Sequence, residues 1–384
     1  MDHLMENLAI NKDKPDYTEW FNTNFKFGLK QVLKFSLQNP RMAAFMAGEI
    51  VRFYFADHRR KKWAAKGVQV PPMLIYSVTS QCNLDCQGCY AKLLHAPKNG
   101  EFNAEKFADV INQADEIGVS YILVAGGEPF MRPELLEVTG AHKGIIFTPF
   151  TNGLLVTDEH IRQLKKQLNV IPIVSFEGYE FQTDKRRGPG VYENGLTLLN
   201  KFKEAGLYYG VSITTTRENF ETISEEGFIA RLADLGCRVF FFINFIPVEE
   251  GSDGLVMTQD QVDALNRAMS VYRQKYPALF LAFPGSEIDL GGCLAAGKGF
   301  VHINAEGDVE PCPFSPYSDA SLKDMPLIEA LRSPLLRAIR ENDVRLDESN
   351  GICALWQNRD WVASLAKDSA KVWHGSSRTA QNVT

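Results

Sequence analysis

Short apolar segments alternate with longer amphipathic segments between residues 73 and 275, and this alternation constrains the fold more than any other feature. The apolar segments are rich in β-branched and aromatic residues and predict strands at 73–79, 120–126, 144–150, 170–176, 208–215 and 238–246. The amphipathic segments predict helices near 102–117, 132–140, 157–168, 191–205, 222–235 and 258–275. Nearly continuous apolar strands alternating with helices indicate a parallel α/β sheet covered by helices. Right-handed crossovers would close or nearly close this sheet into a partial, TIM-like (β/α)6 barrel.

The composition and charge of the sequence change on either side of this region, and these changes predict four units. Residues 1–70 form a helical, basic and amphipathic segment, 71–282 the barrel, 283–356 a small unit rich in Gly, Cys and Pro, and 357–384 a C-terminal helix with a polar tail. In a barrel of this type, functional side chains are expected on the loops after the carboxyl ends of the strands.

Cysteine usage and hydropathy limit the classes of protein to consider. The chain has seven cysteines in 384 residues, an odd and small number that argues against a secreted disulfide scaffold. Its first residues are acidic and polar, unlike a signal peptide, and no apolar run approaches the about 18 residues of a membrane span. We therefore expect a cytoplasmic protein that uses its thiols for metal or redox chemistry, and no nucleic-acid partner.

Residues 26–66 carry ten positive and two negative charges, although the whole chain has a net charge of −6. Lys26, Lys30 and Lys34 recur every fourth residue and would share one helical face, and a second helix is predicted from Pro40 to about Trp63. Three interpretations are open. The segment is a helical pair packed on the barrel with a solvated face, a peripheral contact with an anionic membrane, or a surface that gathers an anionic substrate.

Three cysteines follow the first predicted strand directly, with the spacing C-x3-C-x2-C. They are Cys82, Cys86 and Cys89 in SQCNLDCQGCYA. Three thiolates on one tight loop can hold three irons of a cubane cluster and leave the fourth iron open for chemistry. The alternative is a structural zinc site, for which His95 is the nearby candidate for a fourth ligand.

This spacing, followed by the aromatic Tyr90, resembles the signature of radical S-adenosylmethionine (radical SAM) enzymes. The resemblance implies a 4Fe–4S cluster on the three cysteines and S-adenosylmethionine (AdoMet) on its open iron. It also implies AdoMet contacts at loop positions that match the family motifs: Tyr90, Gly126, Gly127, Glu128, Pro129, Asn152, Ser175, Glu177 and Arg187. Glu177 departs from the aspartate of many relatives. Arg186 is the second choice for the arginine that meets the AdoMet carboxylate.

Three later cysteines, Cys293, Cys312 and Cys353, resemble part of the SPASM/twitch extension found on many radical SAM enzymes. The resemblance implies one auxiliary 4Fe–4S cluster. Residues 304–308 predict a hairpin turn between the first two of these cysteines. The fourth ligand could be Cys237 or a group other than cysteine, or there is no fourth ligand and an open iron would let substrate bind the cluster directly. The competing interpretation is that the late cysteines are structural or bind zinc.

The resemblance implies that a 5′-deoxyadenosyl radical, formed by reductive cleavage of AdoMet, abstracts hydrogen from a substrate C–H bond. The auxiliary cluster would then assist electron transfer or bind substrate. A low-potential donor such as flavodoxin or ferredoxin would supply the electron. A peptide or protein substrate ranks slightly ahead of a lipid or small anionic metabolite, and no catalytic acid or base is assigned. The alternatives of another class are a non-catalytic iron–sulfur electron carrier or redox sensor, and a membrane-surface scaffold built on residues 26–66.

Overall fold

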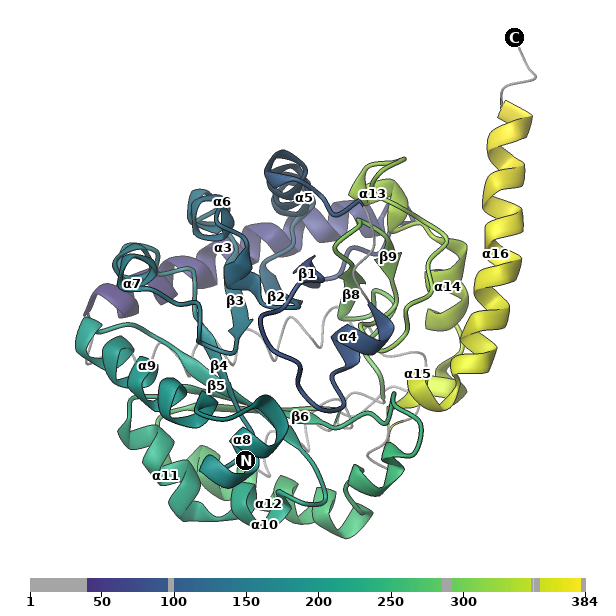
Figure 1. The fold of residues 1–384 in the computed structure, drawn as a ribbon. Coiled ribbons are helices and arrows are strands. Elements are labelled where there is room, and N and C mark those ends of the chain that lie inside the picture. The colour runs from purple at the N-terminus through teal and green to yellow at the C-terminus, as the bar shows by residue number, and fades with distance from the viewer. Residues whose placement is uncertain (1–39, 96–99, 285–291, 347, 349–352, 381–384) are drawn as a thin grey trace, which may run out of the picture.

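A sheet of nine strands forms the centre of the computed structural model, which describes residues 40–95, 100–284, 292–346, 348 and 353–380. The strands are β1 (Met73–Thr79), β2 (Tyr121–Gly126), β3 (Ile146–Thr151), β4 (Ile173–Phe176), β5 (Gly210–Thr215), β6 (Val239–Asn244), β7 (Leu279–Phe283), β8 (Phe300–Ile303) and β9 (Val309–Glu310). Their order is β7-β6-β5-β4-β3-β2-β1-β8-β9, and every neighbouring pair is parallel except β8 and β9. The six predicted strands are confirmed, and the sheet curves into the partial barrel seen in Figure 1.

Helices connect the strands and cover the outer face of the sheet. The helices are α3 (Pro40–Ala64), α4 (Tyr90–Leu94), α5 (Ala104–Ile117), α6 (Leu135–Ala141), α7 (Asp158–Leu164), α8 (Glu180–Arg187), α9 (Val191–Ala205), α10 (Phe220–Ser224), α11 (Glu226–Asp234), α12 (Gln259–Lys275), α13 (Leu327–Ala330), α14 (Pro334–Arg340), α15 (Ala354–Gln357) and α16 (Arg359–Ala380). Short 3₁₀ turns lie at η2 (Pro129–Met131), η3 (Ser252–Leu255) and η5 (Asp343–Leu346). The sequence did not predict α8, which is almost entirely polar.

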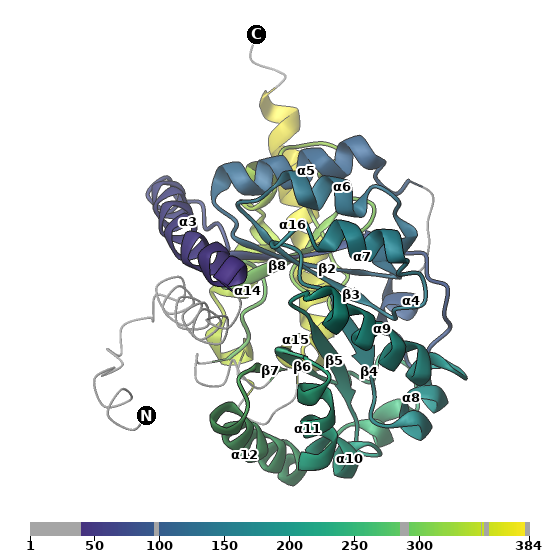
Figure 2. The same ribbon diagram turned by 90° about the vertical axis from the view of Figure 1, so that its left-hand side faces the viewer.

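Alternation along the strands separates two apolar layers, because successive side chains point to opposite faces. On β1, Tyr76 belongs to the core under the helices, with its ring 5.6 Å from that of Phe107 on α5. A second buried cluster joins the inner face of the sheet to α3 and includes Met42, Met46, Phe53, Ile146, Ile171, Ile173, Val239 and Phe241. Ile146, Ile173 and Val239 are the first residues of β3, β4 and β6. α3 therefore packs across the amino ends of the strands, at the opposite end from α4 (Figure 2).

The described part of the basic segment contacts the barrel through its cations. Arg60 is buried and donates a hydrogen bond to the Ser120 hydroxyl at 3.1 Å and another to the Gly118 carbonyl. Burial lowers the pKa of Arg60 to about 10. Arg52 donates to the Lys143 carbonyl at 3.1 Å. These contacts favour the interpretation of a helix packed on the barrel; residues 26–39 lie outside the described residues. No described helix has the length and apolar character needed to cross a membrane.

The late part of the chain extends the same sheet. β8 pairs in parallel with β1, in a register that sets Phe300 beside Met73. The predicted hairpin is present: β9 runs antiparallel to β8, and Gly307 adopts a positive φ of 90° in the turn between them. Only glycine takes such a φ at little cost. α13 to α16 follow on that side of the barrel (Figure 1). The division of the chain into four units stays a prediction.

Candidate active site

The three early cysteines lie on the loop from the carboxyl end of β1 to α4. Cys82 is exposed, Cys86 and Cys89 are half-buried, and Cys89 stands at the N-cap of α4. Partial burial raises the pKa of the Cys82 thiol, and the charges of Cys86 and Cys89 raise it further, so the three thiols share one site. The backbone N–H of Gln87 donates to the Arg186 carbonyl at 3.0 Å and fixes the middle of the loop to α8. Three neighbouring thiols on a partly open loop fit a cubane cluster with one free vertex.

Gly126 and Gly127, at the end of β2, hold the start of this loop. A Cβ on Gly126 would lie 2.2 Å from the Thr79 carbonyl oxygen, and one on Gly127 would lie 1.9 Å from that of Gln81. The two N–H groups of Gly127 and Glu128 donate to these same oxygens at 2.7 and 2.8 Å. The glycines therefore allow the end of β2 to pack directly against the residues that precede Cys82.

Glu128 is buried and joins two loops. Its carboxylate accepts hydrogen bonds from the Phe130 N–H at 3.1 Å, the Thr151 hydroxyl at 2.7 Å and the Asn152 N–H at 2.8 Å. Burial raises its pKa, and these donors oppose the shift. A carboxylate has about four lone-pair positions, so roughly one is left for a further donor. Asn152 in turn donates its amide to Asn83 at 2.8 Å, with the same nitrogen 4.0 Å from the Cys82 sulfur.

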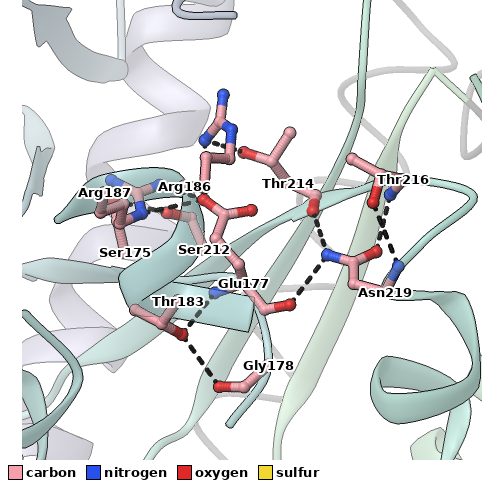
Figure 3. A network of polar contacts seen from close by, with 10 residues as sticks. All are labelled: Ser175, Glu177, Gly178, Thr183, Arg186, Arg187, Ser212, Thr214, Thr216 and Asn219. Atoms are coloured by element: carbon pink, nitrogen blue, oxygen red, sulfur yellow. Dashed lines mark hydrogen bonds and ion pairs between the residues drawn. The ribbon is translucent and has the colours of Figure 1, made fainter. Parts of the chain in front are cut away.

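Glu177, which follows β4, forms ion pairs with Arg186 and Arg187 at the end of α8 (Figure 3). Its Oε1 atom lies 2.7 Å from Arg186 Nη1, 2.8 Å from Arg187 Nε and 2.7 Å from Arg187 Nη2. Its Oε2 atom is buried and has no hydrogen-bond partner among the described residues. The main chain of Glu177 is held as well, by the Thr183 hydroxyl and by the Asn219 amide. The site thus presents an unsatisfied carboxylate oxygen inside a group with net positive charge.

Arg186 and Arg187 also act to lower the pKa of a cysteine on the loop after β1. Burial raises the pKa of the Cys86 thiol, and the charges of Arg187 and Arg186 oppose that rise, so the guanidinium groups lie near enough to favour the thiolate. Ser175, on β4, shares a hydrogen bond with the Ser212 hydroxyl of β5 at 3.0 Å, beside this group (Figure 3). The predicted residues after β1, β2, β3 and β4 therefore meet at one end of the sheet.

The three late cysteines form a second, buried group. The pKa of the Cys293 thiol is raised well above its usual value by burial, by the Glu348 carboxylate, and by Cys353 and Cys312. These four side chains therefore lie near one another. Sequence reasoning missed Glu348, which is buried and accepts a hydrogen bond from the Ala354 N–H at 2.9 Å.

Cys237 is the remaining cysteine, and it is fully buried ahead of β6, at the amino end of the sheet. Its N–H donates to Leu232 at 3.1 Å, and its thiol lies near Tyr209 and Arg238. The contacts of Cys237 thus support a place in the core.

Tyr90 lies between the two cysteine groups. Burial raises its pKa, with smaller effects in the same direction from Cys89 and Cys312, one from each group. Its ring centroid is 4.7 Å from that of Phe314, which follows the hairpin. His95, the residue considered as a zinc ligand beside the early cysteines, turns instead toward this hairpin, with Nε2 2.8 Å from the Pro313 carbonyl oxygen.

Comparisons with known proteins agree with this geometry. Residues 76–232 match the family model described as the Radical SAM superfamily. An AdoMet-dependent heme synthase of Methanosarcina barkeri is 23% identical over 312 residues, covering 74% of this chain and 88% of the relative. The mycofactocin maturase MftC of Mycolicibacterium smegmatis is 26% identical over 273 residues, covering 65% of this chain and 66% of the relative.

Among solved structures, SuiB of Streptococcus suis is similar with a TM-score of 0.62 at 18% identity, covering 75% of this chain and 73% of that one. SuiB has also been solved bound to S-adenosylmethionine and bound to its precursor peptide SuiA. At this identity the likeness establishes a common fold.

Proposed function

Residues 76–232 belong to the radical SAM superfamily, whose members are enzymes that use AdoMet and a 4Fe–4S cluster, and from this premise we propose that the chain cleaves AdoMet reductively at its three-cysteine loop. The observation that carries the proposal is the convergence of Cys82, Cys86 and Cys89 at the carboxyl ends of the strands, beside Glu128, Glu177 and the two arginines. When bound, the cluster and AdoMet supply a 5′-deoxyadenosyl radical that takes a hydrogen atom from substrate.

The polar groups around the loop have distinct roles in this proposal. The remaining lone pair of Glu128 accepts from a cationic group of AdoMet, and its other three hydrogen bonds hold it in place beforehand. The Glu177 Oε2 atom accepts from a hydroxyl or amine of the same ligand, which removes the cost of a buried unsatisfied oxygen. Arg186 and Arg187 leave one positive charge in excess of Glu177, which suits the AdoMet carboxylate.

The second cysteine group supports an auxiliary cluster. Cys293, Cys312 and Cys353 are all buried, and burial raises the pKa of the Cys293 thiol, so a bound cation would favour its thiolate. Glu348 is the non-cysteine group beside Cys293. Tyr90 lies near one cysteine of each group, because both Cys89 and Cys312 act on its pKa.

For the substrate we favour a peptide or protein. The similarity to the maturase MftC and the shared fold with SuiB, which binds a precursor peptide, support this choice. A second candidate is a small anionic metabolite of the tetrapyrrole type. It is favoured by the similarity to an AdoMet-dependent heme synthase over 88% of that relative, since heme and its porphyrin precursors carry carboxylates.

Anaerobic reconstitution tests the function. With AdoMet and a strong reductant, the protein should produce 5′-deoxyadenosine, measured by liquid chromatography and mass spectrometry. The triple variant Cys82→Ala, Cys86→Ala, Cys89→Ala should lose this product and about four irons per chain. Cys237→Ala is the matched control, because this buried cysteine lies outside both groups, and it should keep both. Continued cleavage by the triple variant would refute the site. Peptide and porphyrin substrates are then compared by the rate of 5′-deoxyadenosine formation.

A further inference from the structure

Two histidines and a glutamate meet close to Tyr90. His95 caps the C-terminus of α4, His302 lies on β8, and Glu310 faces it from β9. Each residue offers one possible metal-ligand atom, and these three atoms all lie within 4.8 Å of one another. In the described part of the chain, these residues form the group of three His, Cys, Asp or Glu side chains that meets this distance. We propose that this His–His–Glu group (His95, His302 and Glu310) binds a divalent transition-metal ion of the Zn²⁺ or Fe²⁺ type. The inference does not depend on the proposed function.

Hydrogen bonds determine which nitrogen of His95 faces the carboxylate. His95 Nε2 lies 2.8 Å from the Pro313 carbonyl oxygen, and a carbonyl can only accept, so Nε2 carries the proton. In the neutral ring Nδ1 then has a lone pair. This Nδ1 atom lies 3.9 Å from Glu310 Oε2, too long for a hydrogen bond. Nδ1 of His95 and Oε2 of Glu310 are therefore both atoms that can ligate a metal ion, and they lie close enough for one ion to contact both.

His302 presents its Nδ1 atom to the same oxygen. Nδ1 lies 2.7 Å from Glu310 Oε2, and Nε2 lies 2.8 Å from the Ser77 hydroxyl on β1. A metal ion that replaces the Nδ1 proton requires the proton to stand on Nε2, where Ser77 can accept it. Ser77 can take either role, because a hydroxyl both donates and accepts, so the pocket admits the metal-bound tautomer without losing a hydrogen bond.

The surroundings match those of metal ligands in proteins, which hold each ligand by its second polar atom. The Pro313 carbonyl orients His95, Ser77 orients His302, and the Asn304 amide donates to the other oxygen of Glu310 at 2.9 Å. His302 and Glu310 are buried, so the carboxylate is shielded from bulk water. Two imidazoles and one carboxylate are a ligand set for Zn²⁺ and Fe²⁺, with positions left for water or a substrate oxygen.

Such an ion would join segments that are distant in sequence. α4 begins directly after Cys89, and Glu310 lies two residues before Cys312. The ring centroids of His95 and His302 are 5.1 Å apart, and the His95 ring meets the edge of Tyr90 at 6.5 Å. A metal bound here would therefore fix α4 and the β8–β9 hairpin relative to each other, and with them the two cysteine groups.

The test uses the reconstituted full chain, with its thiols occupied by iron and sulfide, and Zn²⁺ alone as the probe. Zn²⁺ is a fair probe because sites for Fe²⁺ bind it at least as tightly. We expect about one Zn²⁺ per chain by mass spectrometry of the metals. X-ray absorption at the zinc edge should give Zn–N/O distances of about 2.0–2.1 Å, not Zn–S distances of about 2.3 Å.

His302→Gln and Glu310→Gln should each lower the zinc content at least tenfold and leave the iron content unchanged. His58→Gln, which replaces an exposed histidine on α3, should bind zinc like the wild type. Zinc should also raise the melting temperature of the wild type and not that of Glu310→Gln. No bound zinc in the wild type, a sulfur shell, or equal zinc content in wild type and Glu310→Gln would overturn the proposal.

Discussion

Arg187 contacts a single oxygen of Glu177 through two of its nitrogens, Nε at 2.8 Å and Nη2 at 2.7 Å, and the other carboxylate oxygen has no hydrogen-bond partner in the described part of the chain. Arg186 binds the same oxygen from the neighbouring position of α8. This one-sided arrangement is unusual for arginine and carboxylate, which often pair through both oxygens. It leaves Oε2 available for a ligand and makes Glu177 the most informative position to change.

Glu177→Gln should weaken AdoMet binding and destabilise the fold. The change removes the charge that balances two guanidinium groups, at a cost on the order of 3 kcal/mol in the free energy of unfolding. Losing a charge-assisted hydrogen bond to the ligand corresponds to a fall in affinity of about tenfold or more. Denaturant unfolding and calorimetric titration with AdoMet measure the two effects. Glu180→Gln, an exposed position on α8, should change neither; equal results for both variants would contradict the role of Glu177.

Gly127→Ala should displace the cysteine loop. The new Cβ would lie 1.9 Å from the Gln81 carbonyl oxygen, and the nearest atoms are all backbone atoms of Ser80 and Gln81, so no flexible side chain can move aside. Overpacking of this kind costs about 1–3 kcal/mol or more. Both the free energy of unfolding and the iron content after reconstitution should be lower in this variant than in the wild type.

Gly48→Ala is the matched control for that change. It lies inside α3, with nothing within 4 Å of the added Cβ, and should raise the free energy of unfolding by about 0.5–1 kcal/mol. Full iron content in Gly127→Ala would show that the loop does not depend on this close approach.

Loading of the first cysteine group should depend on pH. Burial raises the thiol pKa of Cys82 and of Cys86, so both are more fully protonated at neutral pH than free thiols. Metal ions bind the thiolate, and a rise in pH through the raised pKa values should therefore increase the rate of iron uptake. Arg187→Gln removes the main charge that opposes the Cys86 shift, so its uptake curve should move to higher pH. Iron uptake that is flat from pH 7 to 9 would contradict this account.

The double variant Cys293→Ala, Cys312→Ala should keep the first cluster and lose the iron of the second group. The two thiols that are replaced lie near Glu348 and Cys353, and they do not belong to the loop that follows β1. The variant should still produce 5′-deoxyadenosine but yield little or no modified substrate. Mössbauer spectra and product analysis measure the two outcomes. Iron content equal to that of the wild type would mean that no auxiliary cluster exists.

Much of the fold could be predicted because its elements are locally amphipathic or apolar. The helix predicted at 191–205 has those bounds as α9, and the first strand agrees with β1 at both ends. α8 was missed because its sequence, EFQTDKRR, has almost no apolar residue to give a period. The pairing of β8 with β1 could not be predicted, since it depends on contacts between segments more than 200 residues apart.

The site was predictable as a set of motifs and less so as a set of contacts. The spacing of the cysteines and the glycines after β2 were visible in the sequence, but the use of Glu128 to hold Asn152 depends on the distance between two loops. The position of His302 opposite Glu310 could have been found, because the predicted turn at 304–308 sets these residues across from each other in the hairpin. Glu348 offered no signal, as it belongs to no regular element.

The position of α3 limits how a substrate can reach the cysteine loop. The helix packs against the amino ends of the strands with Met42, Met46 and Phe53, so its apolar side chains occupy that end of the barrel. A substrate of the proposed reaction is therefore expected to reach the cysteine loop from the carboxyl ends of the strands and to leave on the same side.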